Sequence, residues 1–301
     1  MPDQSLPDAV RRLLDERSAA REARDWSRAD ALRDELTSLG WEAQDGQSGS
    51  TARPILAQAP SSLADPAGLV ASLQVVAEDH PDDLARLLHA LAAHPPGTTA
   101  ELVIIANAPS FELDSLLAED GFPIETRVIS TEGRLGWADA RTLGMEQSRG
   151  EVTILLDTSV EPTGDFVTPL LAAFDDPTVG IAGGWGVTSA DAREFVDAPP
   201  GEVDAVEGYC LAVRREALRA VGGFDRRFRW YRNADLDFSF AVRDAGWRAV
   251  RTDPLPLTRH EHRGYTSLAE DERERLSRRN FYRFLDHWRD RPDLLLGRRD
   301  R

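Results

Sequence analysis

The sequence predicts an α/β protein, in which a mostly parallel sheet is flanked by helices and preceded by a small α-helical hairpin. From about Leu69 onward, short continuous apolar runs alternate with helical stretches, the pattern of parallel strands buried on both faces. Residues 7–40 instead carry apolar side chains at helical spacing. The stretch between these regions is rich in Gly, Ser, Ala and Pro, as linkers are. We expect a hairpin at 1–45, a flexible linker at 46–67 and the α/β domain, with a C-terminal helix, at 68–301.

Two amphipathic helices are expected in the N-terminal region. Their apolar stripes consist of Ala9, Val10, Leu13 and Leu14 in the first helix and Ala29, Ala31, Leu32, Leu36 and Leu39 in the second. Trp26 lies between the stripes, and Gly40 is well placed to end the second helix. These signals predict a pair of short helices.

The α/β domain is predicted from its alternating elements. Strands are expected at 73–77, 102–106, 126–129 and 152–156, with helices at 82–93, 112–119 and 137–148 between them. A further strand is expected at 211–213, and helices at 215–221, 235–245 and 268–287. Ligands of such sheets bind outside the carboxyl ends of the strands. Asp157 directly follows the strand at 152–156, so it is predicted to lie where a ligand binds.

Composition excludes several chemistries. All 36 basic residues are arginine, so the chain has no lysine for a Schiff base or a Walker A loop. Cys210 is the one cysteine, which excludes an internal disulfide and a multi-cysteine zinc site. Any bound anion must therefore be held by arginine, backbone N–H groups, a helix N-terminus or a metal.

Charge is distributed unevenly. Residues 1–200 hold 14 Arg and 34 acids, net −20, whereas residues 201–301 hold 22 Arg and 18 acids, net +4. These arginines either lie on solvated helices or face a phosphorylated ligand. A formal net charge of −16 makes nucleic acid an unlikely partner. The first residues lack a signal-peptide pattern, and no apolar run approaches the roughly 18–20 residues that span a bilayer. We expect a cytoplasmic protein, either free or peripheral at the inner membrane face.

Seven segments resemble, in order, the family-2 glycosyltransferases of GT-A fold. They are LQVVAEDHPDDLARLLHAL, LVIIANAPS, GRLGWADARTLGM, VTILLDTSVEP, VEGYCLAVRREALRAVGGFDRRF, NADLDFSFAVRDAGWRAV and DPLPLTRH. The resemblance implies a Rossmann-like GT-A domain. It also implies transfer of a sugar from a nucleotide-diphospho sugar to an acceptor hydroxyl, with inversion. The diphosphate leaving group calls for Mn²⁺, Mg²⁺ or arginine. The acceptor would be a glycan, a lipid-linked molecule or a protein.

By resemblance, the donor-binding residues are Asp79, Asn107, Arg141, Asp157 and Ser159, with Arg263 as a candidate diphosphate partner. Asp157 matches the first carboxylate of the family's DxD motif, but Ser159 stands where a second aspartate is usual. A hydroxyl is a poorer ligand for a hard divalent cation than a carboxylate, which puts metal affinity in question. The predicted metal ligands are Asp157 and His260, with His262 as a second candidate. Either histidine could instead be a satisfied or exposed side chain, and Arg263 a solvated one.

Asp235 matches the aspartate that serves as catalytic base in the family. The alternative is a first-turn acid that stabilises the helix dipole. Asp237 follows two residues later and should point elsewhere, so it is expected to be structural. On the acceptor side the resemblance places Glu207, Gly208 and Tyr209, although a plain turn before the next strand would also explain them.

The N-terminal hairpin resembles the C-terminal tail of cysteinyl-tRNA synthetases. The similar segment is LLDERSAAREARDWSRADALRDELTSLGWEAQD, and RADALRDEL is its most telling part. Residues 1–50 hold 7 Arg and 11 acids, net −4, which disfavours RNA binding. We expect a protein-contact hairpin that could support a homodimer.

Three functions remain open from the sequence. The first is a metal-assisted glycosyltransferase. The second is a catalytically weakened GT-A domain that binds a nucleotide, glycan or protein partner, suggested by Ser159, Ala234, Glu78 and Thr142 at family motif positions. The third, an RNA-associated protein, rests on analogy alone. We favour the first.

Overall fold

The computed structural model describes residues 7–39, 41–46, 49–54, 61–117 and 122–299. Contacts divide the chain into two compact units, Met1–Ala59 and Pro60–Arg301. Among the described residues, no helix combines the length and apolar character needed to cross a membrane.

The smaller unit contains the predicted helix pair, followed by a β-hairpin. Helices α1 (Asp8–Glu22) and α2 (Trp26–Ser38) pack through Val10, Leu13, Leu14, Leu32 and Leu36. The Asp25 carboxylate accepts a hydrogen bond from the backbone N–H of Arg28 and so caps α2. Strands β1 (Trp41–Gly46) and β2 (Gly49–Pro54) pair antiparallel.

The prediction of an irregular linker over 46–67 is wrong for Gly49–Pro54. These residues form β2, whose backbone groups pair with β1 and whose Ala52 packs against the helix core. Composition suggested a linker because Gly, Ser and Pro are rare in strands, but pairing with a neighbouring strand overrides that preference. Residues 55–60 of the predicted linker lie outside the described residues, and Ser62–Ala64 forms the 3₁₀ turn η1.

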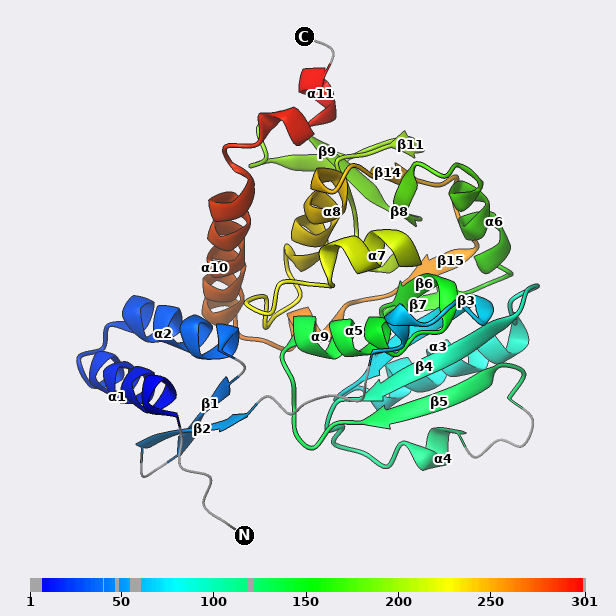
Figure 1. Ribbon diagram of the computed structural model, residues 1–301. Helices are drawn as coiled ribbons and strands as arrows, with labels where there is room; N and C mark the ends of the chain where they lie inside the picture. The colour runs from blue at the N-terminus through cyan, green and yellow to red at the C-terminus, as the bar shows by residue number, and fades with distance from the viewer. Residues whose placement is uncertain (1–6, 40, 47–48, 55–60, 118–121, 300–301) are drawn as a thin grey trace. The chain divides into compact units, whose positions relative to one another are not determined.

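The larger unit is built on an eight-stranded, mostly parallel sheet in the order β11-β14-β8-β13-β6-β3-β4-β5 (Figure 1). The strands are β3 (Leu69–Ala77), β4 (Ala100–Ala106), β5 (Glu125–Ser130), β6 (Gly150–Leu156), β8 (Val179–Gly183), β11 (Gly201–Glu202), β13 (Cys210–Arg214) and β14 (Arg248–Arg251). The four strands predicted before residue 157 are present and parallel to one another. Strand β13 runs antiparallel to β6 and β8.

Helices cover both faces of the sheet. The described helices of this unit are α3 (Pro81–Ala93), α4 (Asp114–Leu117), α5 (Trp137–Glu146), α6 (Val167–Ala172), α7 (Arg215–Val221), α8 (Ala234–Asp244), α9 (Arg263–Thr266), α10 (Glu270–Trp288) and α11 (Leu296–Arg299), with 3₁₀ turns η2 (Ala173–Asp175) and η3 (Pro292–Leu294). Of these, α10 packs on α8, and α11 packs on η3 and β9. Leu102 and Ile104 of β4 pack in the same cluster as the leucines of α3. Val103 and Ile105 face the other way, toward Ala140 and Leu143 of α5. Burial on both faces explains the unbroken apolar runs in the sequence.

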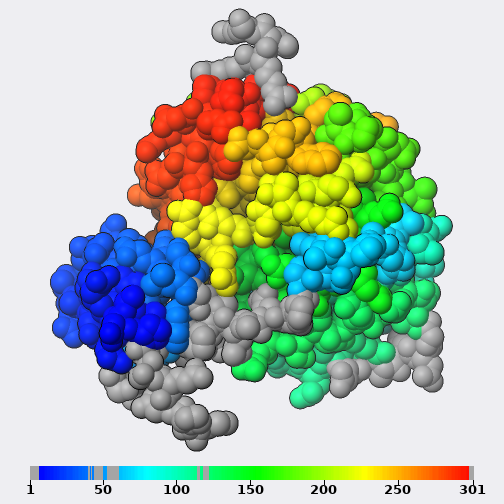
Figure 2. All heavy atoms as spheres, in the orientation of Figure 1, coloured from blue at the N-terminus to red at the C-terminus, as the bar shows by residue number. Residues whose placement is uncertain are grey.

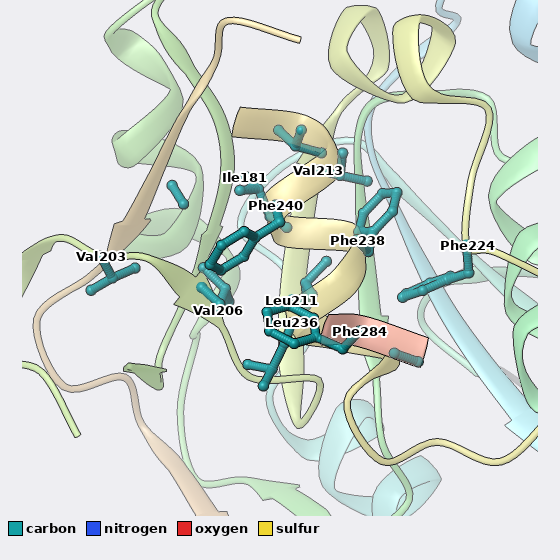
Figure 3. Close-up of a cluster of buried hydrophobic side chains, with 14 of the residues drawn as sticks. Ile181, Val203, Val206, Leu211, Val213, Phe224, Leu236, Phe238, Phe240 and Phe284 are labelled. Atoms are coloured by element: carbon teal, nitrogen blue, oxygen red, sulfur yellow. The ribbon is translucent and has the colours of Figure 1, made fainter. Parts of the chain in front are cut away.

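A second core surrounds α8 (Figure 3). Phe238 and Phe240 of α8 pack with Phe284 of α10 and with side chains of β8 and β13 such as Ile181 and Leu211. This packing holds the start of α8 against the main sheet. Figure 2 shows that the residues from α7 to α10, coloured yellow to red, form one continuous stretch of surface.

Two small sheets were not expected as sheets from the sequence. One pairs β7 (Val160–Pro162) with β15 (Leu257–Arg259). The other has the order β10-β9-β12, with β9 at Gly186–Ser189, β10 at Phe195–Asp197 and β12 at Ala205–Val206. Their strands have at most four residues, too few for a period-2 pattern to be detected. Both sheets flank the carboxyl end of β6, so they shape the region beyond Asp157.

Candidate active site

The polar residues gather at one edge of the main sheet because of strand direction. Parallel strands β3, β4 and β6 all end at this edge, at Ala77, Ala106 and Leu156. Strand β13 runs the opposite way with Cys210 opposite Leu156, so the residues before Cys210 reach the same edge. The backbone N–H of Asp157 donates to the Tyr209 carbonyl at 3.0 Å, which joins the two chain segments directly.

Two cavities open at this edge and share Trp137, Asp157 and His262. The larger, of about 520 Å³, also contains Glu207, Gly208, Tyr209 and Asp235 in its lining. The smaller, of about 80 Å³, also contains Asp79, Arg141, Ser159 and Arg263. The structure thus separates the residues predicted for the acceptor side and the base from most of those predicted for the donor, with Asp157 between the two groups.

Asp157 is held from three directions. Ser159 donates to its Oδ1 through the backbone N–H at 2.9 Å and through the hydroxyl at 2.5 Å. His262 Nε2 lies 3.3 Å from Oδ2, and Arg141 Nη2 lies 3.8 Å from the same oxygen. Burial alone would raise the pKa of Asp157, but the hydrogen bond and charge of His262 oppose it. With the Arg141 charge and the Ser159 hydroxyl, they lower the pKa far below its usual range, so the carboxylate is ionised.

The structure corrects the choice of histidine. His260 Nε2 lies 2.6 Å from Glu161 Oε2, and His260 lines neither cavity. His262 is the histidine that faces Asp157, and it also stacks on Tyr231 with ring centroids 4.3 Å apart. Burial by itself would lower the pKa of His262, but the hydrogen bond to Asp157 outweighs it and raises the pKa. Of the two candidate histidines, His262 is therefore the one that faces Asp157.

Arg141 and Arg263 occupy different settings in the smaller cavity. Arg141 is 3% exposed, and its Nη1 donates to Gln74 Oε1 and to the Leu156 carbonyl, both at 3.0 Å. It is a fixed buried cation under Asp157. Arg263 is more exposed, and its Nη2 donates to Asp83 Oδ1 at 3.0 Å. In this structure Arg263 is therefore paired with an acid, while still lining the cavity.

Asn107 does not have the donor-binding setting that was predicted. It is fully buried, and its Nδ2 donates to Glu78 Oε1 at 2.7 Å and to the Leu135 carbonyl at 3.2 Å. Its Oδ1 accepts from the Leu135 N–H at 2.7 Å, so the amide fastens the loop before α5. Asp79 does line the smaller cavity, where its carboxylate pairs with Arg134 at 2.7 Å.

Asp235 faces the larger cavity from the first turn of α8. Its Oδ2 accepts a hydrogen bond from the Gly208 N–H at 2.8 Å, and its Oδ1 accepts one from the Leu236 N–H at 3.0 Å. Burial raises the pKa of Asp235, although these backbone hydrogen bonds oppose the shift. The residue before α8, Asn233, has a φ of 64° and makes no side-chain cap. Asp235 is thus a first-turn acid that is also presented to a cavity.

Asp237 points away from the cavities, as the helical spacing predicted. Its Oδ1 accepts hydrogen bonds from His287 at 2.9 Å and from Trp288 Nε1 at 2.8 Å, both on α10. Asp225 lies in the same cluster, where ligand atoms of Asp225, Asp237 and His287 converge. Arg227 already donates to both oxygens of Asp225 and contacts His287. The cluster is therefore an ion-pair network that joins α10 to the rest of the unit.

Several lining residues of the larger cavity were missed at the sequence level. They are Trp137, Val187, Arg193, Phe195, Asp197, Tyr231, Arg232, Asn233, Leu236, Glu274, Ser277, Arg278 and Phe281. Most lie on the β9–β10 region and on α10, which are distant in sequence from Asp157. The signal that could have identified some of these lining residues is an aromatic side chain in an otherwise polar loop, as at Tyr231.

The arginine-rich third contributes three arginines to the lining of the two cavities. Arg232 and Arg278 line the larger cavity and Arg263 the smaller. Many of the other arginines pair with acids, such as Arg248 with Asp176 and Arg291 with Asp244. The charge asymmetry therefore reflects mainly surface and buried ion pairs, with a small share at the cavities.

Comparison with known proteins identifies two kinds of similarity. The sequence model described as Glycosyl transferase family 2 matches residues 75–237, and that of the Cysteinyl-tRNA ligase anticodon binding domain matches residues 3–51. A pre-mycofactocin glycosyltransferase of Mycobacterium tuberculosis is 28% identical over 165 residues, 49% of this chain and 33% of that protein. A cysteine–tRNA ligase of Chlamydia caviae is 47% identical over 47 residues, 16% of this chain and 10% of that protein. The chain thus spans about a third of the length of the first curated relatives it matches.

Solved structures share the fold of the larger unit. The structure of GalNAc-T7 with UDP, GalNAc and Mn²⁺ has a TM-score of 0.62 and 18% identity, covering 75% of this chain and 50% of that chain. The mannosyltransferase PcManGT from Pyrobaculum calidifontis, in complex with GDP-Man and Mn²⁺, has a TM-score of 0.51 and 16% identity, covering 81% and 66%. These likenesses confirm the predicted GT-A fold, and the hairpin resemblance is confirmed by the second family match.

Proposed function

Because the chain belongs to glycosyltransferase family 2, we propose that it transfers a sugar from a nucleotide-diphospho sugar to an acceptor hydroxyl, with inversion at the anomeric carbon. The observation that carries the proposal is that Asp157 and Asp235 face one cavity from two separate elements. The donor would lie across Asp157, with part of its nucleotide in the smaller cavity and its sugar in the larger one beside the acceptor. If the protein is cytoplasmic, as the sequence predicts, it would meet nucleotide-sugar donors in that compartment.

Asp235 is proposed as the general base. It would take the proton of the acceptor hydroxyl as that oxygen forms its bond to the anomeric carbon. The bond from the anomeric carbon to the diphosphate oxygen breaks, and the nucleoside diphosphate leaves with the electron pair. Two backbone N–H groups hold the carboxylate of Asp235 in place, so it needs little reorganisation to accept the proton.

The residues around Asp157 fit a divalent cation. The Asp157 carboxylate and His262 Nε2 face each other, and His262 Nδ1 is buried without a hydrogen-bond partner. One carboxylate and one imidazole are a small ligand set, which Mg²⁺ or Mn²⁺ would accept when substrate phosphates and water supply oxygen for the remaining positions. When bound, the cation would neutralise charge on the leaving diphosphate. Ser159 supplies a hydroxyl where a second carboxylate is usual, so we propose a weak, donor-dependent metal site.

Arginine is proposed to supply part of the phosphate neutralisation. Arg141 is a buried permanent cation 3.8 Å from Asp157, and Arg263 lines the same smaller cavity. Arg263 would exchange its hydrogen bond with Asp83 for one with the donor diphosphate. With no lysine in the chain, these two guanidinium groups are the cations best placed for that role.

A second candidate function is a catalytically weakened domain that binds a nucleotide or glycan without transferring it. The Ser159 hydroxyl favours it, because it donates to Asp157 and leaves that carboxylate as the one acid between the cavities. Calorimetry with nucleoside diphosphates separates the two functions. Metal-independent binding without turnover would favour the second.

The first prediction concerns Asp235→Asn. We expect kcat for transfer to fall by at least about 100-fold, the usual contribution of a general base, with donor affinity nearly unchanged. The assay measures release of nucleoside diphosphate from a panel of UDP- and GDP-sugars with candidate acceptors, with and without Mn²⁺. NMR of the product reports whether the configuration inverts. Asp253→Asn, at an exposed acid away from both cavities, is the matched control. An unchanged kcat in Asp235→Asn would remove the base role.

A further inference from the structure

Glu207 is the second carboxyl group of the larger cavity that lies close to Asp235. It sits between β12 and β13, and its backbone N–H donates to the Trp185 carbonyl at 3.0 Å. The next residue, Gly208, donates its N–H to Asp235 Oδ2 at 2.8 Å. The loop that carries Glu207 is therefore tied directly to the proposed base, and both carboxyl groups line one cavity.

Within the described part of the chain, the Glu207 carboxyl group has no hydrogen-bond or ion-pair partner. The hydrogen bond that this residue does make there comes from its backbone N–H. Asp225, another half-buried acid of this unit, is paired with Arg227. Glu207 is only partly buried and lines the larger cavity, so a ligand oxygen can replace the water that meets its carboxyl group there. A ligand in the cavity would supply the missing partner.

The surrounding charges favour a neutral Glu207. Burial, followed by the charge of Asp235 on α8, raises the pKa of Glu207 to about 7. Asp197 on β10 acts in the same direction. Arg259 on β15 and Arg251 on β14 act in the opposite direction. Asp235 accepts two backbone hydrogen bonds that favour its ionised form, whereas Glu207 has none. Near neutral pH the pair can therefore hold one proton, on Glu207.

We propose that Glu207 binds the acceptor, its neutral carboxyl group donating a hydrogen bond to an acceptor oxygen beside the hydroxyl whose proton Asp235 takes. The proposal rests on the proposed glycosyl transfer and adds a substrate class, an acceptor with two neighbouring oxygens, as in sugars and other polyols. Glu207 keeps its proton throughout. The hydroxyl proton goes to Asp235, the acceptor oxygen joins the anomeric carbon, and the diphosphate leaves.

Substitutions of Glu207 separate this role from a structural one. Glu207→Ala is expected to raise the acceptor KM about tenfold, the effect of one lost hydrogen bond of about 1.4 kcal/mol, with the donor KM unchanged. Glu207→Gln keeps a donating group at every pH. It should retain an acceptor KM within about threefold and abolish the loss of kcat/KM that the wild type shows above about pH 7. Glu216→Gln, at an exposed position on α7, is the matched control.

Three results of these kinetics would overturn the proposal. One is an acceptor KM that is unchanged in Glu207→Ala. Another is an alkaline limb that persists in Glu207→Gln, because that limb would then belong to another group such as His262. A loss of kcat in Glu207→Gln as large as in Asp235→Asn would make Glu207 the base and would also contradict the assignment.

A measurement without turnover distinguishes failure of this inference from failure of the proposed function. Carboxyl ¹³C NMR of the free protein, assigned by its difference from Glu207→Gln, should show Glu207 titrating near pH 7. In Asp235→Asn the titration should move toward the ordinary value of 4.5, because the neighbouring charge is removed. Titration near 4.5 in the wild type would overturn the inference even if the enzyme transfers sugar. Titration near 7 supports it even if no donor in the panel turns over.

Discussion

At the scale of residues, Asp157 is the one carboxylate of a motif that usually has two, because Ser159 occupies the second position. It is held by a hydroxyl, an imidazole and a guanidinium at 2.5, 3.3 and 3.8 Å, respectively. Each of these groups favours the ionised carboxylate. A metal bound there would compete with Arg141 for Asp157 Oδ2 and would replace the hydrogen bond between His262 and that oxygen. Ser159 is therefore the position at which metal affinity can be changed most directly.

We predict that Ser159→Asp raises the affinity for Mn²⁺ and makes the thermal stability of the protein depend on Mn²⁺. The side chain at this position is 2% exposed and lies against Asp157, so a second carboxylate adds like-charge repulsion in a buried place. Without metal, Tm should fall by about 5 °C, the effect of roughly 2 kcal/mol in a chain of this size. With Mn²⁺, calorimetry should show an affinity at least about tenfold above that of the wild type. Ser159→Asn, similar in size but neutral, should lose stability without gaining metal affinity. Equal Mn²⁺ affinity in all three proteins would show that the site does not hold the metal.

The sequence predicted the positions of residues that begin or directly follow a regular element. Asp157 follows a buried strand, and Asp235 lies in the first turn of a strongly patterned helix, so their directions follow from geometry. The choice between His260 and His262 could not be made in that way. Strand β15 ends at Arg259 and α9 begins at Arg263, so the residues between them follow neither period. Tertiary packing sets their directions.

At the scale of elements, the attachment of α10 decides the shape of the larger cavity. Glu274, Ser277, Arg278 and Phe281 of this helix contribute to the cavity lining. The helix is anchored on α8 by Phe284 in the core and by His287 and Trp288 at Asp237. The sequence predicted the helix from its period, but not its partner, because periodicity identifies an apolar face without saying what covers it.

We predict that His287→Gln destabilises the protein more at pH 5.5 than at pH 8.5. The hydrogen bond to Asp237 raises the pKa of His287, while burial and the Arg227 charge oppose the shift. A pKa that is higher in the folded than in the unfolded state gives stability that is fully present below about pH 6.5. That stability is lost as pH rises through the folded value. Urea unfolding should show a loss of about 1 kcal/mol at the lower pH and a smaller one at the higher pH.

His94, the partly exposed residue that follows α3, provides the control for this titration. Its substitution by Gln should shift the urea midpoint little at either pH, because its side chain is not buried in a core. A loss of stability in His287→Gln that is equal at both pH values would mean that packing against α8, and not the charged pair with Asp237, anchors the helix.

At the scale of the whole molecule, the two compact units are separate in content: both cavities belong to the larger unit, and the smaller unit has a core of its own. The lining residues of both cavities lie between Val76 and Phe281, all in the larger unit. The core of the smaller unit consists of residues between Val10 and Ala52. The two compact units meet after Ala59, within the region where composition predicted a linker. Composition could not reveal β2, because backbone pairing leaves no mark in composition. The two family matches follow the same division.

We predict that residues 60–301 alone bind a nucleoside diphosphate as the full chain does. The described core clusters of this unit begin at Leu63, so the truncation removes none of their packing. Arg215 and Arg219 bind the carbonyl groups of Ser62, Leu63 and Asp65, which remain in the shortened chain. Calorimetry with UDP and GDP should give dissociation constants within about twofold of those of the full chain, a difference below 0.5 kcal/mol.

Sedimentation of the same two proteins tests the predicted role of the hairpin. If the hairpin supports a homodimer, the full chain should sediment at twice its monomer mass, whereas residues 60–301 should sediment as a monomer. Because the nucleotide cavity belongs wholly to the larger unit, loss of the dimer should leave nucleotide affinity unchanged. A truncated protein that keeps its circular dichroism spectrum but loses UDP and GDP binding would show that the smaller unit takes part in the donor site. A full chain that sediments as a monomer would remove the homodimer and leave the hairpin as a contact for a different protein.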